Sequence, residues 1–187
     1  MAEAKAHLRV DTDAEDALIA AWIEAARQDV ETATGRAMML QDWEIWLDEF
    51  PSRYRRGCWT RDGDVVLPHP PLAGILSVKT VAADGTETTI TDAEYQVVTP
   101  SGPLAEQGYL LPLAGYYWPV TTCGVAGAVR VRYRAGYASA DAVPAPLRAA
   151  ILLAVGDLYA NREQSSAANI TDNPAFKRLI APYRTYW

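Results

Sequence analysis

The residues best suited to chemistry in this sequence are two histidines and two cysteines, and none has the spacing of a known site. His7 and His69 each lack a partner at metal-ligand spacing, and His69 sits among prolines. Cys58 and Cys123 lie far apart without a CxxC motif, which argues against zinc or a disulfide framework and favours a reducing compartment. We therefore expect no metal and no cofactor. A hydrolase that uses Cys58 or His69 stays an open alternative.

Carboxylates are numerous, but structural roles explain them better than catalysis does. Asp42, Glu44 and Asp48 follow the alternation of one expected strand, where a cation site is conceivable and a solvated face is the simpler interpretation. The GxSxG, GxxxxGK[ST] and GxGxxG motifs do not occur. The sequence thus predicts a protein that is not an enzyme.

Two groups of arginines could contact phosphates or an acidic protein surface. The range Arg53–Arg61 combines arginines with Tyr54 and Trp59, as surfaces that bind phosphates and stack bases do. The formal net charge of −6 is the opposite of what gripping nucleic acid requires. A nucleic-acid-binding module that uses Arg53–Arg61 and Arg130–Arg134 is kept as an alternative. We assign the second group to a contact with a neighbouring subunit: Arg130, Arg132 and Arg134.

The overall numbers favour one folded domain. The chain has 187 residues, half of them hydrophobic, which suffices for a sizeable core. The N-terminus has no apolar stretch of the signal-peptide kind, so we expect a protein made in the cytoplasm.

Two long helices are expected to form the scaffold of the fold. The stretch from Val10 to Gly35 has an apolar side, an acidic start with capping-box spacing at Thr12 and Glu15, and a terminal glycine. The stretch from Val143 to Glu163 is the longest apolar segment, and its bulky side chains fill one broad arc. We expect these helices to pack together, although they are distant in the sequence.

The second helix also carries a stripe of very small residues. At about 100° per residue, Ala149, Gly156 and Ala160 fall on one side of it. A bare helix face lets another backbone approach closely, so we assign these three residues to a subunit interface.

The region between the helices has the alternation and turn signals of strands. Residues 41–48 and 127–137 alternate apolar and polar side chains, and Asp84-Gly85 is a hairpin signal. The proline-rich stretch around His69 is excluded from a central strand. We therefore predict an α+β fold in a single domain, 1–187, with a helical core from 1–36 and 142–187 and a β-rich insertion at 37–141.

The C-terminal segment ends in aromatic residues, which is unusual because tails are normally polar. Asn173-Pro174 begins a last short helix. The composition is that of interface anchors, and a tail folded back on its own core is the alternative.

Several stretches, in this order along the chain, resemble one family. They include AHLRVDTDAEDALIAAWIEAARQDVETATGRAM, WEIWLDEFP, LPHPPLAGILSVKTVAADG, VRVRYRAGYA and VPAPLRAAILLAVGDLYANRE, followed by LIAPYR near the end. The ordered set resembles the head–tail connector (adaptor) proteins of long-tailed double-stranded DNA phages, including prophage and gene-transfer-agent versions. The resemblance covers nearly the whole chain.

The resemblance implies a structural subunit without catalytic residues. It implies a dodecameric ring below the portal, in the neck of the particle, that extends the DNA channel and joins head to tail. The implied partners are further copies of the chain, a portal protein, a stopper or tail-completion protein and passing DNA, with no membrane. A stopper or tail-completion ring protein is the nearest alternative. Portal docking is assigned by hypothesis to Phe176, Leu179, Ile180, Tyr183, Arg184, Tyr186 and Trp187.

Overall fold

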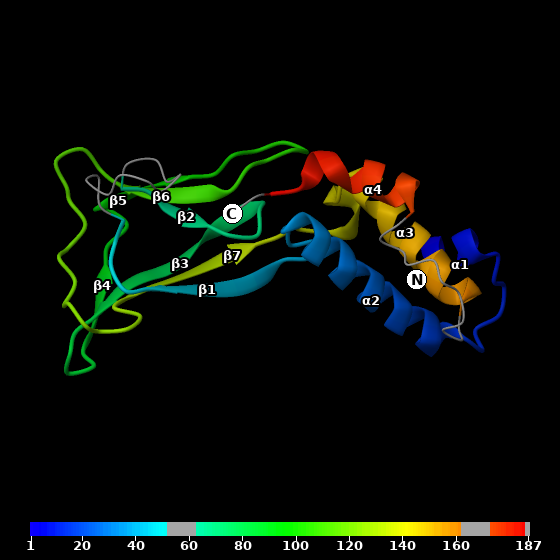
Figure 1. Ribbon diagram of the computed structural model, residues 1–187, viewed down its shortest axis with the longest axis horizontal. Coiled ribbons are helices and arrows are strands. Elements are labelled where there is room, and N and C mark those ends of the chain that lie inside the picture. The colour runs from blue at the N-terminus through cyan, green and yellow to red at the C-terminus, as the bar shows by residue number, and fades with distance from the viewer. Residues whose placement is uncertain (52–62, 162–172, 186–187) are drawn as a thin grey trace. The chain divides into compact units, whose positions relative to one another are not determined.

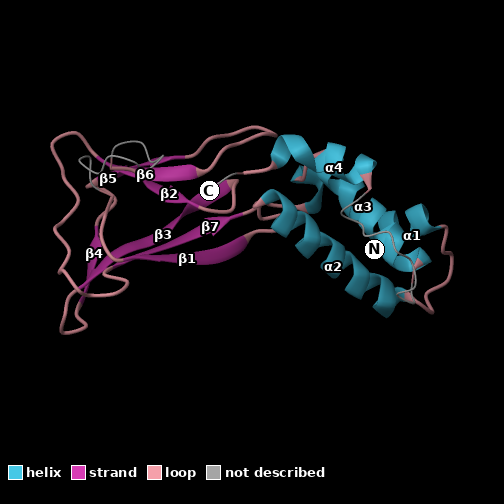
Figure 2. Cartoon of the chain, viewed as in Figure 1, coloured by secondary structure: helices cyan, strands magenta, loops and turns pink. Residues whose placement is uncertain are grey.

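The computed structural model describes residues 1–51, 63–161 and 173–185, which form two compact units. The helical unit combines the two ends of the chain, 1–38 and 139–187, and the β-unit is the continuous stretch 39–138. These borders lie within three residues of those expected from the sequence. Figure 2 shows the helices in cyan and the strands in magenta, so the predicted α+β class, with terminal helices that pack together, is confirmed.

The helical unit is organised around the packing of two helices. The first, α2, begins at Asp16 and ends at Thr34, and it lies against α3, Ala145–Ala160 (Figure 1). Trp22 meets Tyr159 edge to face at 5.6 Å, and the Tyr159 hydroxyl hydrogen-bonds Glu15 at 3.0 Å. The predicted packing of these distant helices is therefore confirmed.

Two short helices complete this unit, and both contact α3. The N-terminal helix α1 spans Ala2–Leu8, and α4 spans Pro174–Ile180. The Asn173 side chain caps α4 by accepting from the amides of Ala175 and Phe176, as its Asn-Pro start predicts. A 3₁₀ turn at Ala181–Tyr183 follows directly.

The start of α2 differs from the prediction. Glu15 is its N-cap and makes no side-chain capping bond, so the expected capping box at Thr12 is wrong. Asp13 and Asp16 instead bind the Lys5 amino group at 2.6 and 2.9 Å, which ties α1 to the first turn of α2. The other end is as expected, because Gly35 closes the helix in the left-handed region with φ 69°.

The face of α3 that is most buried is made largely of small residues. Leu147, Ala150, Ala154 and Val155 are buried, whereas the bulky side chains at 151–153, 158 and 159 are only partly covered. Of the bulky arc noted in the sequence, Leu147 and Val155 are buried and the remaining side chains are partly covered. Ala150 and Ala154 are fully buried, and side chains of this size let neighbouring helices come close together.

The β-unit contains two antiparallel sheets (Figure 1). Sheet A has the order β1-β7-β3-β4, and sheet B has the order β2-β6-β5. The strands of sheet A are β1 (Gln41–Leu47), β3 (Leu72–Val81), β4 (Glu87–Ile90) and β7 (Val129–Ala135). Those of sheet B are β2 (Val65–Leu67), β5 (Tyr95–Val98) and β6 (Gly108–Pro112). The proline-flanked β2 is an edge strand, in agreement with its exclusion from the centre.

One apolar core joins the two sheets. It includes Leu67 and Leu110 from sheet B and Val78, Val131 and Tyr133 from sheet A, all essentially inaccessible to solvent. Alternation turns one face of each of the strands β1 and β7 toward this core: Trp43, Ile45 and Leu47 of β1, and Val129, Val131 and Tyr133 of β7. The same alternation puts the arginines of β7 on the opposite face.

Candidate functional site

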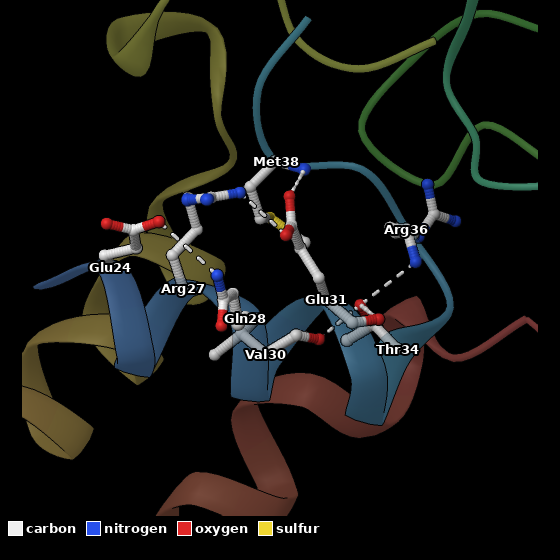
Figure 3. A network of polar contacts seen from close by, with 8 residues as sticks. All are labelled: Glu24, Arg27, Gln28, Val30, Glu31, Thr34, Arg36 and Met38. Carbon is white, nitrogen blue, oxygen red and sulfur yellow. Dashed lines mark hydrogen bonds and ion pairs between the residues drawn. The ribbon is translucent and has the colours of Figure 1, made fainter. Parts of the chain in front are cut away.

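The end of α2 carries the polar network of the helical unit, and Figure 3 shows it. Glu31 binds Arg27 through one carboxylate oxygen at 2.7 Å and accepts the Met38 amide with the other at 2.7 Å. The Thr34 hydroxyl donates to the Val30 carbonyl at 2.6 Å and accepts the Arg36 amide at 3.3 Å. These bonds fix the chain as it leaves the helix, and therefore fix where the Arg36 side chain lies.

The C-terminal segment lies on this fixed turn, and we call Thr34, Gly35 and Arg36 the tail seat. Thr185 donates to the Thr34 carbonyl from its amide at 2.8 Å and from its hydroxyl at 3.0 Å. Arg36 Nε donates to the Tyr183 carbonyl at 2.6 Å, and its guanidinium carbon lies 5.8 Å from the centre of the Tyr183 ring. A side chain at Gly35 would overlap the Thr185 hydroxyl.

The residues assigned to portal docking therefore have unequal accessibility. Phe176, Ile180 and Tyr183 are buried within the helical unit, Leu179 is partly buried, and Arg184 is exposed. Tyr186 and Trp187 lie outside the described residues. For the buried three, the structure shows the alternative arrangement, a tail folded back on its own core.

The small-residue stripe of α3 is covered in part by the chain itself. The ring of His7, from α1, lies against Gly156, with Nε2 3.3 Å from the place a Cβ would occupy. Ala149 is partly buried and Ala160 is exposed. At Gly156, close approach thus serves α1, a packing that the sequence analysis did not foresee. Packing within one subunit therefore accounts for a glycine at position 156. The assignment of Gly156 to a subunit interface stays a hypothesis.

The arginines of β7 lie on the outer face of sheet A, each opposite a β1 residue. Arg134 binds Asp42 with two hydrogen bonds, at 2.6 and 3.1 Å, and Arg132 stands opposite Glu44. The Arg134 guanidinium holds the pKa of the Asp42 carboxyl below its usual range.

Arg130 is the third arginine of this face, and it too has partners within the chain. It binds Glu87 at 2.8 Å and stacks over Trp46 at 4.5 Å. Hydrogen bonding to Lys79, and then the charge of Arg130, keeps the pKa of Glu87 low. Carboxylates thus neutralise two of the three arginines in the chain itself, which weakens the case for phosphate binding at this face.

The residues considered for chemistry are accounted for by packing. His69 stacks on Trp43 with ring centres 4.0 Å apart, and Asp48 accepts the Gly127 amide at 2.9 Å. No group of three potential metal ligands occurs within the described ranges. Cys123 is exposed and unpaired. The predictions for Cys58, Tyr54, Trp59 and the arginines of 53–61 fall outside the described residues.

A loop after β6 presents apolar side chains to solvent. Tyr116, Tyr117 and Val120 are at least half exposed. Trp118, by contrast, anchors the loop to the β-unit. Its ring stacks on Phe50 with centres 4.5 Å apart, and its indole N–H donates to the Gly63 carbonyl at 2.8 Å. No described helix is long and apolar enough to cross a bilayer.

The described residues considered for chemistry thus take part in packing, hydrogen bonds and ion pairs within the chain. Residues 1–57 match the phage gp6-like head-tail connector protein family, a family of structural connectors rather than enzymes. This match, over the first 57 residues, bears out the resemblance found in the sequence.

Solved structures similar over the whole chain come from gene transfer agent (GTA) particles. A chain in the neck of an empty GTA particle, computed with C6 symmetry, matches all of this chain and 88% of its own length, with 25% identity and a TM-score of 0.77. A chain of the native GTA virion matches with 26% identity, a TM-score of 0.75 and coverages of 100% and 89%. A chain from a native GTA neck computed with C12 symmetry shares the fold, at 23% identity, a TM-score of 0.69 and coverages of 98% and 88%. No curated protein sequence matches the chain.

Proposed function

We propose that this protein is the subunit of a homo-oligomeric ring in the neck of a tailed phage or GTA particle. The ring lies below the portal, joins the head to the tail and surrounds the passage for DNA. The observation that carries this proposal is the likeness of the entire chain to a GTA neck protein, at a TM-score of 0.77. The proposed copy number is twelve, which is compatible with the sixfold symmetry of that neck.

The electrostatics support a wall that DNA passes without being retained. The net charge is −6, and the described arginines of β7 have acidic neighbours in the same chain. DNA binding rests on unpaired cationic surface that displaces counterions. A gel shift that persists at physiological salt would instead favour the nucleic-acid-binding alternative.

The partners proposed for the ring are a portal protein on one side and a stopper or tail-completion protein on the other. Docking on the portal is assigned to the C-terminal segment, with Leu179 and Arg184 as its accessible described residues. The subunit contacts are assigned to the small-residue stripe of α3, Ala149, Gly156 and Ala160, and to the arginines of β7, Arg130, Arg132 and Arg134.

Affinity purification from cells that make the particle tests the proposal. A portal protein should co-purify with the tagged chain, and native mass spectrometry should show a closed ring in that complex. Recovery of the chain with tail components but without portal would favour the stopper alternative.

A further inference from the structure

The tail seat satisfies a helix end that would otherwise be incomplete. The last carbonyls of a helix have no partners within the helix. Here the Thr34 carbonyl accepts two hydrogen bonds from Thr185, a residue at the far end of the chain. Tyr183 and Thr185 are thus fixed by hydrogen bonds as well as by packing.

Arg36 stabilises this contact, but its own hydrogen-bonding groups are only partly satisfied. Its side chain is 97% buried, with one hydrogen bond from Nε to the Tyr183 carbonyl. Its Nη1 atom has no hydrogen-bond partner in the part of the chain that the structure describes. A buried cation with an unsatisfied donor carries a desolvation cost, which offsets part of what the contact contributes.

The apolar anchors of the segment lie before the seat. Phe176 and Ile180 of α4 are almost completely buried. Tyr183 and Thr185 are held by hydrogen bonds to the tail seat. Residues 181–185 can therefore leave while α4 stays packed, since only polar contacts and the Tyr183 ring have to separate.

We propose that the tail seat is an autoinhibitory contact, which holds residues 181–185 closed in the free subunit until the docking partner displaces them. This proposal rests on the proposed function, in which the C-terminal segment docks on the portal. A segment that is competent to bind only when released has its apparent affinity reduced by the fraction released. The seat would thus limit binding by unassembled subunits.

The test weakens the seat without touching the docking residues. In Arg36→Met the apolar stem is retained and the hydrogen bond to Tyr183 is lost. The amide of Thr185, bonded to the Thr34 carbonyl, should then exchange with deuterium at least about tenfold faster, as expected for loss of a hydrogen bond to a charged group. Arg178→Met is the matched control, because Arg178 is exposed on α4.

The second measurement is the association rate of the full-length protein with isolated portal rings. Arg36→Met should dock faster than the wild type, whereas a purely structural role for Arg36 predicts slower docking. Thr185→Val, which removes only the hydroxyl donor, should shift both measurements in the same direction by less. Unchanged exchange, or slower docking by both variants, would overturn the autoinhibitory contact.

The proposed docking role is tested separately with a chain that ends at Pro182. If this truncated chain binds portal rings as well as the full chain does, tail docking is wrong, whatever the exchange experiment shows. If the truncated chain keeps its thermal unfolding temperature but fails to bind, and the exchange at Thr185 is unchanged in Arg36→Met, tail docking stands and the autoinhibitory contact falls.

Discussion

The helical unit and the β-unit leave very different surfaces uncovered. In the helical unit, Ala150 and Ala154 of α3 are buried, while Ile151, Leu152 and Leu158 stay partly accessible. In the β-unit, the core side chains are buried between two sheets, and the outer face of sheet A carries the ion pairs of Arg130 and Arg134. A partly covered apolar helix face gains free energy when a partner covers it. A face of exposed, solvated ion pairs gains little from the same contact. The contrast makes α3 a stronger candidate for subunit contact than the arginines of β7.

The largest expected effect comes from truncating a core residue in one unit, which should destabilise that unit and not the other. Phe176→Ala should destabilise the helical unit by about 3–5 kcal/mol, because it removes a buried ring that closes the packing of α4. Hydrogen exchange resolved by segment should show faster exchange in α2–α4 and unchanged protection in β3 and β7. Leu110→Ala is the matched variant in the β-unit and should give the reverse pattern. Equal loss of protection in both units would show that they unfold as one.

A smaller effect is expected where α1 crosses α3. Gly156→Leu should cost about 1–3 kcal/mol, because the new side chain has to displace the His7 ring. Thermal unfolding measures the change. His7→Ala combined with Gly156→Leu should recover part of the loss, and if it recovers none, α1 does not pack there.

The core of the β-unit contains a buried hydroxyl group, that of Tyr133, whose hydrogen bonding can be tested. Tyr133 is fully buried, and its hydroxyl has no hydrogen-bond partner among the described residues. Burial raises the pKa of this phenol. Tyr133→Phe should therefore raise the stability, by up to about 1 kcal/mol, because an unsatisfied polar group is removed. Urea unfolding that shows a clear loss instead would mean that the hydroxyl has a partner in solution.

The smallest effect concerns the charged face. Arg134 lowers the pKa of Asp42 in the folded protein, so the pair contributes stability above the ordinary pKa of an aspartate, about 4. That contribution is lost as the pH falls through the lowered pKa. Arg134→Gln should return the pKa of Asp42 toward its ordinary value in an NMR titration, with little change in stability at neutral pH. An unchanged pKa of Asp42 would show that the ion pair with Arg134 does not form in solution.

The two units also differ in what the sequence could predict. Periodicity located α2, α3, the Asp84-Gly85 hairpin and the alternation of β7, because each depends on neighbouring residues along the chain. It missed the contact of His7 with Gly156 and the tail seat, because these join residues from opposite ends of the chain. Arg36 gave no signal, since a single arginine after a helix is ordinary in sequence. The burial of Phe176, Ile180 and Tyr183 could not be separated from exposure, because an interface anchor and a core residue have the same composition.

The same burial changes how the tail should be studied. Deletion of residues 170–187 would be the simplest test of portal docking. That deletion also removes Phe176, Ile180 and Tyr183 from the helical core, so failure to assemble would not distinguish lost docking from lost folding. Point variants at the tail seat avoid the ambiguity.

The most direct test of the account is an electron cryo-microscopy reconstruction of the particle that contains this chain. The account predicts a closed ring of copies of this fold below the portal, with DNA passing through its centre and α3 against a neighbouring subunit. A particle in which the chain lies outside the neck, or is present there as separate single copies, would contradict it.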